Sequence, residues 1–357
     1  MYISVIIPVR NEAAHIAGVL DKLLEQDYDS SRFECIVVDG CSTDATPQIV
    51  RQYCDKYPNV RYLENPRRLA SAARTIGVIH SKGSAVLVVD GHCIIDNRDM
   101  LKHAAKAFDE SGAECLGRPQ PLEMKNASTL QWSIAAARRS PLGHHPDSFI
   151  YSSEAQFSPA SSVAIAYRKT VFEKIGYFDE TFDACEDVEF NTRCDKAGLR
   201  CYFEPAIAVR YVPRNTIDAL AYQLYRYGQG RVRLYRKHPE TFSFKGFAPG
   251  FFIFGVIAGF ILLAVTPLVL LWNSTVPGLN TIFCVLSAFY LFVLMMYGLA
   301  VCVESVRLSI KERRLSMLFY LPSVFLAIHA GFGWGVVREF FAKRRVTSYL
   351  FTCRNHP

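Results

Sequence analysis

The sequence predicts an α/β domain with a mainly parallel, Rossmann-like sheet, followed by C-terminal transmembrane helices. Short apolar runs alternate with helical patterns over residues 3–89, which is typical of successive βαβ units. Residues 246–303 then carry no Asp, Glu, Lys or Arg. That apolar stretch is long enough for two helices of the ~20 residues that cross a membrane.

The elements are expected in the following order. Apolar, β-branched runs predict strands at residues 3–8, 33–38, 60–63, 85–89, 157–167, 200–203 and 207–211. Apolar residues at helical spacing predict helices at residues 13–26, 47–57, 69–80, 100–111, 188–197 and 218–235. In the last of these helices arginines interleave with aromatic residues, which is typical of a helix at a membrane surface or of an ordinary surface helix.

Charge is distributed unevenly along the chain. Residues 1–192 hold 20 Lys and Arg against 26 Asp and Glu, residues 193–245 hold 11 against 4, and residues 304–357 hold 9 against 3. The basic charge therefore flanks the apolar region, as expected on the cytoplasmic side of a membrane. This pattern argues against a nucleic-acid partner.

These patterns divide the chain into five parts: an α/β domain (1–215), a basic amphipathic interface helix (216–245), a transmembrane hairpin (246–303), a basic cytoplasmic loop (304–316) and a third apolar segment with a basic tail (317–357). The third apolar segment contains Pro322 and His329 and is either spanning or re-entrant. A re-entrant or interfacial segment is favoured because it keeps the basic tail inside.

The compartment follows from the cysteines and the N-terminus. The 11 cysteines form no C-x-x-C pair, which fits a reducing compartment. The chain enters its first strand without a basic n-region, so no signal peptide is expected. We expect a multi-pass protein of the cytoplasmic (inner) membrane with its α/β domain in the cytosol.

Polar residues stand at the C-terminal ends of three of the predicted strands. No G-x-G-x-x-G motif follows the first strand, which argues against a dinucleotide-binding dehydrogenase. Carboxylates at several strand ends point to one crevice, since ligands bind at the carboxyl ends of parallel strands. Asp90 on its own could equally cap a turn, and Asp187 could cap a helix. The strand-end residues are Arg10, Asn11, Glu12, Asp39, Asp90 and His92.

Taken in order, these motifs resemble those of family 2 glycosyltransferases with the GT-A nucleotide-diphospho-sugar transferase fold, in their membrane-anchored subgroup. The stretches that carry the resemblance are residues 5–12, 37–46, Ala73-Arg74, Asp90-Gly91-His92, Glu186-Asp187 and Gln223-Leu224-Tyr225-Arg226-Tyr227. Thr75 and Tyr227 stand where the family has Asn and Trp. His92 replaces the second acid of the family's Asp-x-Asp motif.

The resemblance implies a role for each site residue. It implies nucleotide-sugar binding by Pro8, Arg10, Asn11, Glu12, Asp39, Arg74 and Asp90, and diphosphate or acceptor binding by Gln223, Arg226, Tyr227 and Arg231. The resemblance also implies that Asp187 is the catalytic base and that Glu186 is its neighbour. The spacing of the two acids alone does not show which of them is the base. Instead of binding a diphosphate, these arginines could contact anionic lipid headgroups at the membrane surface.

Asp90 and His92 are expected to hold a divalent cation, Mn²⁺ or Mg²⁺. Mn²⁺ is favoured because imidazole suits it better than it suits Mg²⁺, which prefers oxygen ligands. Gly143-His144-His145-Pro146 is a weaker candidate metal pair, and Asn273-Ser274-Thr275 a weak glycosylation pattern.

The expected function is inverting transfer of a sugar from a nucleotide-diphosphate donor. The expected acceptor is lipid-linked, of the polyprenyl-diphosphate type, at the cytoplasmic membrane face, in polysaccharide or glycan biosynthesis. One alternative is a processive polysaccharide synthase, which usually has more spanning helices and an unaltered Gln-x-x-Arg-Trp element. The other is a non-catalytic membrane scaffold, which the acids at positions 39, 90, 186 and 187 disfavour.

Overall fold

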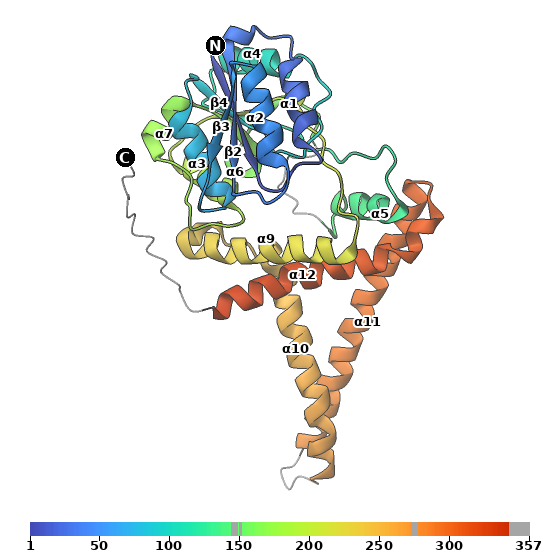
Figure 1. Ribbon diagram of the computed structural model, residues 1–357. Helices are drawn as coiled ribbons and strands as arrows, with labels where there is room; N and C mark the ends of the chain where they lie inside the picture. Colours follow the sequence, from blue (N-terminus) through green and yellow to red (C-terminus); the bar gives the residue numbers. More distant parts are fainter. Residues whose placement is uncertain (144–148, 150–151, 273–277, 343–357) are drawn as a thin grey trace.

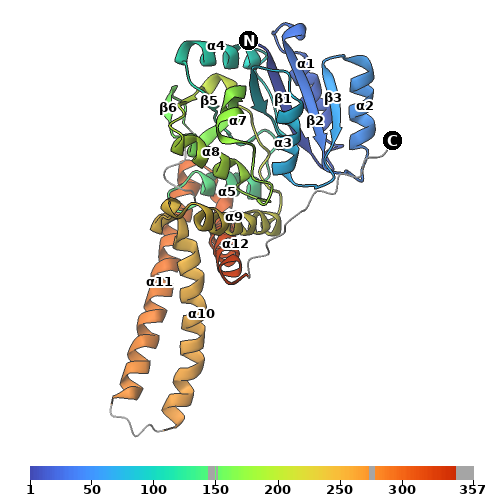
Figure 2. The same ribbon diagram turned by 90° about the vertical axis from the view of Figure 1, so that its left-hand side faces the viewer.

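The computed structural model describes residues 1–143, 149, 152–272 and 278–342 (Figure 1). An α/β domain lies on one side of two long helices that run across its base, and a helical hairpin projects from their other side (Figures 1 and 2). The candidate histidine pair 144–145, the Asn273–Thr275 pattern and the basic residues 343–345 lie outside the described residues.

The first half of the domain is a set of βαβ units, as predicted. β1 (Ile3–Val9), β2 (Phe33–Asp39), β3 (Val60–Glu64) and β4 (Ala85–Val88) are parallel and lie in the order β3-β2-β1-β4. Pro8 does not end the first strand, which continues to Val9. The intervening helices are α1 (Ile16–Leu24), α2 (Thr46–Lys56) and α3 (Ala70–His80).

The second half completes a sheet of eight strands within the described residues. β7 (Ala164–Arg168) is antiparallel to both β4 and β5 (Cys115–Gly117), so β4 and β5 run in the same direction. β8 (Cys201–Phe203) is parallel to β5, and β6 (Gln156–Ser158) is the antiparallel edge strand. α4 (Met100–Ser111) and α7 (Lys169–Ile175) complete this half.

Two predicted strands are wrong. Residues 157–167 are not one strand, because Pro159 and the short helix α6 (Ala160–Val163) separate β6 from β7. Residues 207–211 are not a strand either. The chain there makes a 3₁₀ turn (Pro205–Ile207), and Arg210 and Tyr211 then form only isolated bridges to Ile94 and Leu122.

Two helices connect the domain to the membrane region. α8 (Glu186–Lys196) begins two residues before the predicted start, so Glu186 and Asp187 lie in its first turn. α5 (Thr129–Arg138) begins with a capping box between Ser128 and Gln131, and it packs against α12.

The C-terminal part consists of α9 (Ile217–Lys237), α10 (Phe244–Leu271), α11 (Leu279–Lys311) and α12 (Leu321–Phe341). In the described part of the chain, three helices (α10, α11 and α12) are long and apolar enough to cross a membrane. α11 extends through Lys311, so most of the expected loop 304–316 is helical. α10 and α11 form the projecting hairpin, whereas α12 runs alongside α9 (Figures 1 and 2).

α12 differs from the hairpin helices in its burial. In its most apolar stretch 56% of residues are buried within the protein, against 11% for α10 and 6% for α11. Glycines allow close contact with α9: a Cβ on Gly228 would lie 2.1 Å from the carbonyl oxygen of Phe332, and one on Gly335 would lie 2.1 Å from that of Tyr225. α9 and α12 therefore form one packed layer beneath the α/β domain.

Candidate active site

The carboxyl ends of β1, β2, β4 and β5 meet at one edge of the sheet, because these four strands share one direction. Arg10 follows β1, Asp39 ends β2, Asp90 comes two residues after β4, and Arg118 follows β5. This is the edge at which α/β sheets bind ligands.

The loops after β1 and β2 are tied together by Asn11. Its backbone adopts the left-handed conformation (φ 57°), its backbone N–H donates to Ser42 Oγ (2.7 Å), and its side-chain oxygen accepts from the Thr43 N–H (2.8 Å). Pro8 lies half-buried inside β1, and Arg10 is exposed at the strand end. Asn11 thus ties together the loops at the ends of the two strands.

Asp39 is buried, with 2% of its surface exposed. Its carboxylate accepts hydrogen bonds from the Tyr62 hydroxyl (3.0 Å), the Ser42 N–H (3.1 Å) and the Ser42 hydroxyl. These bonds fix the direction of the carboxylate at the end of β2.

Asp90 is held from the opposite side of the site. The Tyr211 hydroxyl donates to Asp90 Oδ2 (2.7 Å), while Oδ1 accepts no hydrogen bond from the described residues. Burial raises the pKa of Asp90, but the charge of Arg74 and the Tyr211 hydrogen bond outweigh it and leave the pKa below its ordinary value. Asp90 is therefore ionised at neutral pH.

His92 is paired with Glu12 of the first loop. His92 Nδ1 lies 2.9 Å from Glu12 Oε1, and this hydrogen bond raises the pKa of the imidazole. With Nδ1–H donating to the carboxylate, Nε2 keeps its lone pair for another partner. Metal-binding histidines are commonly oriented by a carboxylate in this way.

Among the described residues no three His, Cys, Asp or Glu side chains form a ready metal cluster. Asp90 Oδ1 and Nε2 of the neutral His92 imidazole would supply one carboxylate oxygen and one imidazole nitrogen, a pair of ligands that Mn²⁺ accepts. The residues thus fit a divalent cation whose remaining ligands come from elsewhere, such as phosphate oxygens.

Arg118 was not identified from the sequence. Its side chain is completely buried, and none of its three guanidinium nitrogens has a hydrogen-bond partner among the residues that the structure describes. It lies close enough to Asp90 and Cys93 for its charge to act on both. An unpartnered buried guanidinium is costly, so its presence at the ligand-binding edge indicates an anion site.

Arg74 joins the two halves of the site. Arg74 Nη2 lies 3.3 Å from Glu186 Oε1, and both side chains are about 9% exposed. Burial lowers the pKa of Arg74, but the charges of Glu186, Asp187 and Asp90 raise it above its ordinary value. Arg74 on α3 therefore sits between Asp90 and the two acids of α8.

The two neighbouring acids differ in their surroundings. Burial raises the pKa of Glu186, although Arg74 opposes this effect. Asp187 is half-buried and forms no ion pair with the described residues; its Oδ1 accepts only the N–H of Val188 (2.8 Å). Asp187 is thus the more accessible carboxylate of the pair.

The α9 residues divide into two groups. Gln223 Nε2 donates to the Tyr227 hydroxyl (3.1 Å). Burial raises the pKa of Tyr227, Arg138 of α5 lowers it and Asp187 raises it further, which places the phenol near both groups. Gln223 and Tyr227 therefore lie on the side of the site that faces α5.

The two arginines of α9 in the predicted site, Arg226 and Arg231, have different surroundings from Gln223 and Tyr227. Arg226 donates to the backbone oxygen of Asp183, in the loop that leads into α8. Arg231 has no hydrogen-bond or ion-pair partner in the described ranges, and its charge acts on Cys185. Arg226 is thus occupied by the protein itself, whereas Arg231 remains available to an anion.

Sequence reasoning missed Arg118, Tyr211, Ser42 and Tyr62. Arg118 directly follows the three-residue strand β5, so the strand-end signal was present but the strand was too short to recognise. Tyr211 lies 121 residues from Asp90 in the chain, and no local pattern connects them.

Two family models match the chain. The model described as glycosyl transferase family 2 matches residues 4–176, and the model described as glycosyl transferase family group 2 matches residues 103–334. The second match covers more than half of the chain and includes the membrane region.

Curated relatives agree with these matches. The chain is 28% identical over 236 residues to the succinoglycan biosynthesis protein ExoA of Rhizobium meliloti (strain 1021), covering 66% of this chain and 70% of ExoA. It is 24% identical over 338 residues to a dolichyl N-acetyl-alpha-D-glucosaminyl phosphate 3-beta-D-2,3-diacetamido-2,3-dideoxy-beta-D-glucuronosyltransferase of Methanococcus voltae, covering 94% of this chain and 95% of that protein.

A solved structure shares the fold. The mannosyltransferase PcManGT of Pyrobaculum calidifontis, in complex with GDP-Man and Mn²⁺, superimposes with a TM-score of 0.60 at 19% identity, covering 96% of this chain and 88% of that one. The predicted GT-A fold and the predicted resemblance to family 2 glycosyltransferases are confirmed. The chain belongs to glycosyl transferase family 2 and is a glycosyltransferase.

Proposed function

We propose that this protein is an inverting glycosyltransferase that moves one sugar from a nucleotide-diphosphate donor to a lipid-linked acceptor at the membrane surface. The observation that carries the proposal is the position of Asp187. It is an accessible, unpaired carboxylate at the ligand-binding edge of the sheet, on a helix that packs against the membrane-side layer of α9 and α12.

The donor is proposed to bind across the strand ends. Asp39 would contact the base, and Pro8, Arg10, Asn11 and Arg74 would line the nucleotide sugar. Asp90 and His92 would hold a divalent cation, Mn²⁺ rather than Mg²⁺ because of the imidazole ligand. When bound, that cation neutralises charge on the diphosphate leaving group. The complex of PcManGT with GDP-Man and Mn²⁺ is consistent with this arrangement.

Two cations of the protein itself complement this role. Arg118 is buried beside Asp90, and its three guanidinium nitrogens have no partner among the described residues, so it would stabilise negative charge on a phosphate of the donor. Arg74 stays paired with Glu186 next to Asp187 and opposes the rise that burial causes in the pKa of Glu186.

Asp187 is proposed to accept the proton of the acceptor hydroxyl as that oxygen attacks the sugar carbon. A single base opposite the leaving group suffices for an inverting displacement. Glu186 is less suited to this role because its carboxylate is buried against Arg74.

The acceptor is proposed to approach from the layer formed by α9 and α12. Tyr227 and Gln223 lie near Asp187 on that side, and Arg231 is available for a diphosphate. The dolichyl-phosphate chemistry in the name of the Methanococcus voltae relative supports a lipid-linked acceptor of the polyprenyl type.

We further propose that α10 and α11 form a spanning hairpin and that α12 lies at the cytoplasmic membrane surface. The burial of α12 against α9 leaves it little surface for lipid on one side. Its exposed side chains, Leu326, Trp334 and Phe341, recur along the opposite side, as in an interfacial helix. The α/β domain would then face the cytosol.

The test uses the full-length protein in detergent with a panel of nucleotide sugars and polyprenyl-linked acceptors. The wild type should add one sugar per acceptor, and Asp187→Asn should bind donor in calorimetry but transfer sugar only at a small residual rate. Long polymeric products would instead indicate a processive synthase. Full transfer by Asp187→Asn would remove Asp187 as the base, and absence of donor binding by the wild type would favour a scaffold.

A further inference from the structure

The turn that carries the two acids is attached to α9 before Glu186. Arg226 donates to the backbone oxygen of Asp183, and Arg233 pairs with the Asp183 carboxylate. Arg233 also donates from Nε to Oε1 of Glu339 on α12 (3.0 Å). Asp183 is therefore held by two arginines of α9, one of which is itself fixed by α12.

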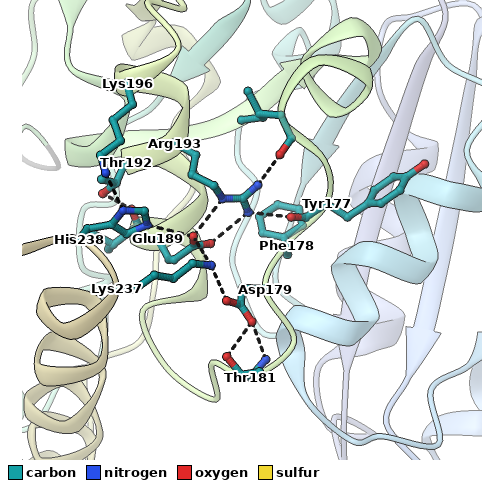
Figure 3. A network of polar contacts seen from close by, with 12 residues as sticks. Tyr177, Phe178, Asp179, Thr181, Glu189, Thr192, Arg193, Lys196, Lys237 and His238 are labelled. Carbon is teal, nitrogen blue, oxygen red and sulfur yellow. Dashed lines mark hydrogen bonds and ion pairs between the residues drawn. The ribbon is translucent and has the colours of Figure 1, made fainter. Parts of the chain in front are cut away.

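The same turn is attached again after Asp187, by Glu189. Glu189 is completely buried and accepts from Arg193 Nε (2.9 Å), Lys237 Nζ (2.8 Å) and His238 Nε2 (3.2 Å) (Figure 3). Lys237 and His238 stand at the C-terminal end of α9, just before the chain enters the first hairpin helix. Figure 3 shows these partners converging on the one carboxylate.

Between the two attachments, the backbone of the turn lies directly against α9. Cys185 adopts the left-handed conformation (φ 62°) that few non-glycine residues adopt. A Cβ on Gly230 would lie 2.7 Å from Cys185 Sγ and 2.8 Å from the Ala184 carbonyl oxygen. The strained turn is thus kept in place by contacts from α9 on both sides and in the middle.

We infer that Asp183 and Glu189 are positioning residues, which hold Asp187 in its working position by fixing the start of α8 to α9. This inference rests on the proposed role of Asp187 as the base. A base must lie within hydrogen-bond reach of the proton it accepts, and a displacement of about 1 Å can cost roughly 100-fold in rate. At the strand ends Asp39, Asp90 and His92 are held by other partners, Tyr62, Tyr211 and Glu12, so the donor site should change little when these contacts are lost.

The first test compares Glu189→Gln with Glu34→Gln. Glu34 is also a buried carboxylate, bonded to Ser4 (2.7 Å) and Arg61 (2.9 Å), but it stands at the opposite end of β2 from Asp39. Glu189→Gln should lower kcat by roughly 10-fold to 100-fold while the donor KM stays within about 3-fold. Glu34→Gln should leave kcat within about 3-fold of the wild type.

Lys237→Met provides a second variant that leaves Glu189 with Arg193 and His238 as partners. It should fold as the wild type does and should lower kcat in the same direction by a smaller factor. Unchanged kcat in both Glu189→Gln and Lys237→Met would overturn the inference.

The second test asks whether Glu189 acts through Asp187. Residues that act on one group are non-additive. Glu189→Gln should therefore reduce the residual rate of Asp187→Asn by less than about 3-fold, although it reduces the wild-type rate by at least about 10-fold. Equal reductions in both backgrounds would show that Glu189 does not work through Asp187.

Failure of the inference and failure of the proposed function are distinguishable. Wild-type rates in Asp187→Asn alone would remove the proposed base. An inactive Asp187→Asn combined with a Glu189→Gln enzyme that matches Glu34→Gln would remove only the positioning role.

Discussion

At the scale of single residues, the surroundings separate groups that look alike in the sequence. Glu186 and Asp187 are adjacent, yet one is buried against Arg74 and the other is accessible and unpaired. His92 and Asp90 likewise differ in their partners: the imidazole is oriented by Glu12 and the carboxylate by Tyr211. Each difference supports one of the proposed chemical roles, which residue type alone leaves open.

The proposed metal site is tested by two substitutions at His92. His92→Ala should weaken donor binding in the presence of Mn²⁺ by about 10-fold to 100-fold, because one of two protein ligands is lost. His92→Asp should retain binding and shift the preference toward Mg²⁺, since both ligands would then be oxygen. Calorimetry with each metal measures both effects, with His103→Ala on α4 as control. Mn²⁺ dependence that His92→Ala leaves unchanged would contradict the assignment.

Replacing Arg118 should lower the rate of sugar transfer without lowering the free energy of unfolding. Arg118→Met removes a buried guanidinium whose three nitrogens have no partner among the described residues. A buried donor left without a partner costs about 1–3 kcal/mol, so the free energy of unfolding should not fall. Transfer should drop by at least about 10-fold, because the anion loses its charged partner.

Arg168→Met is the matched control. Arg168 donates to the backbone oxygens of Ala113 (3.0 Å) and Phe108 (2.7 Å), so its loss should destabilise the protein. Thermal unfolding in detergent and transfer assays compare the two variants. A loss of stability in Arg118→Met as large as in Arg168→Met would make Arg118 a structural residue.

At the scale of elements, α9 is the central piece. It contacts α8 on one side and α12 on the other. Arg226 and Arg233 of α9 bind Asp183 in the turn before α8, and Arg233 also donates a hydrogen bond to Glu339 of α12. The helix predicted over residues 218–235 is confirmed, but the structure shows Arg226 and Arg233 engaged within the protein. Diphosphate binding by Arg226 stays a prediction, and Arg231 is the arginine of α9 that is proposed to bind the diphosphate.

Close packing of α9 on α12 can be tested at its glycines. Gly228→Ala would place a methyl group 2.1 Å from the Phe332 carbonyl oxygen, so the helices must separate, at a cost of about 1–3 kcal/mol in the free energy of unfolding. Gly298→Ala on α11 meets no atom within 4 Å and should be neutral or slightly stabilising. Thermal unfolding in detergent measures both, and equal values would contradict the packing of this layer.

The attachment of α8 to α9 should depend on pH. Burial raises the pKa of Glu189, but hydrogen bonds from Arg193, Lys237 and His238 hold it below the ordinary value of 4.5. Ionised Glu189 thus stabilises the folded state above the unfolded pKa, and this contribution is lost as pH falls through the lower folded pKa. The neighbouring charges are those of Arg193, Lys237, Lys196, Asp179 and His238.

The stability difference between the wild type and Glu189→Gln should therefore be constant near pH ~7 and shrink below pH ~4.5. Chemical denaturation at both pH values measures it. Glu110→Gln, at an exposed pair with Lys106, should show no such trend. A difference that grows as pH falls would contradict the sign of the shift.

At the scale of the whole molecule, catalytic and membrane parts share a packed layer. A second hydrophobic core joins α5, α9, α11 and α12 through residues such as Ile134, Leu224, Leu308 and Phe325. The relation between the sheet edge and the hairpin is therefore set by side-chain packing and not by a loose linker. This arrangement suits an enzyme whose acceptor stays in the lipid phase.

Topology provides the test at this scale. A reporter fused after residue 357 should report the cytosolic side if α12 is interfacial and only α10 and α11 span. A reporter inserted between α10 and α11 should report the outer side, which serves as the internal control. An outer signal from the C-terminal fusion would show that α12 spans.

The sequence by itself determined the parallel half of the sheet, the hairpin helices and the candidate residues at the ends of β1, β2 and β4. Apolar periodicity and strand-end polarity are local signals, and they are strong where strands are long and fully buried. The family motifs added Arg74 and the Glu186-Asp187 pair, which lie on helices far from those strand ends in the chain.

Only the tertiary structure decided how these residues are partnered. The three-residue strand β5 is too short to show periodicity, so Arg118 at its end became visible only when the strands were assembled. Tyr211, Glu339 and Glu189 act through contacts that span 49 to 121 residues of chain, which no local pattern encodes. The tertiary structure also decides why Asp187 is more accessible than Glu186, because the fold places different neighbours beside each acid.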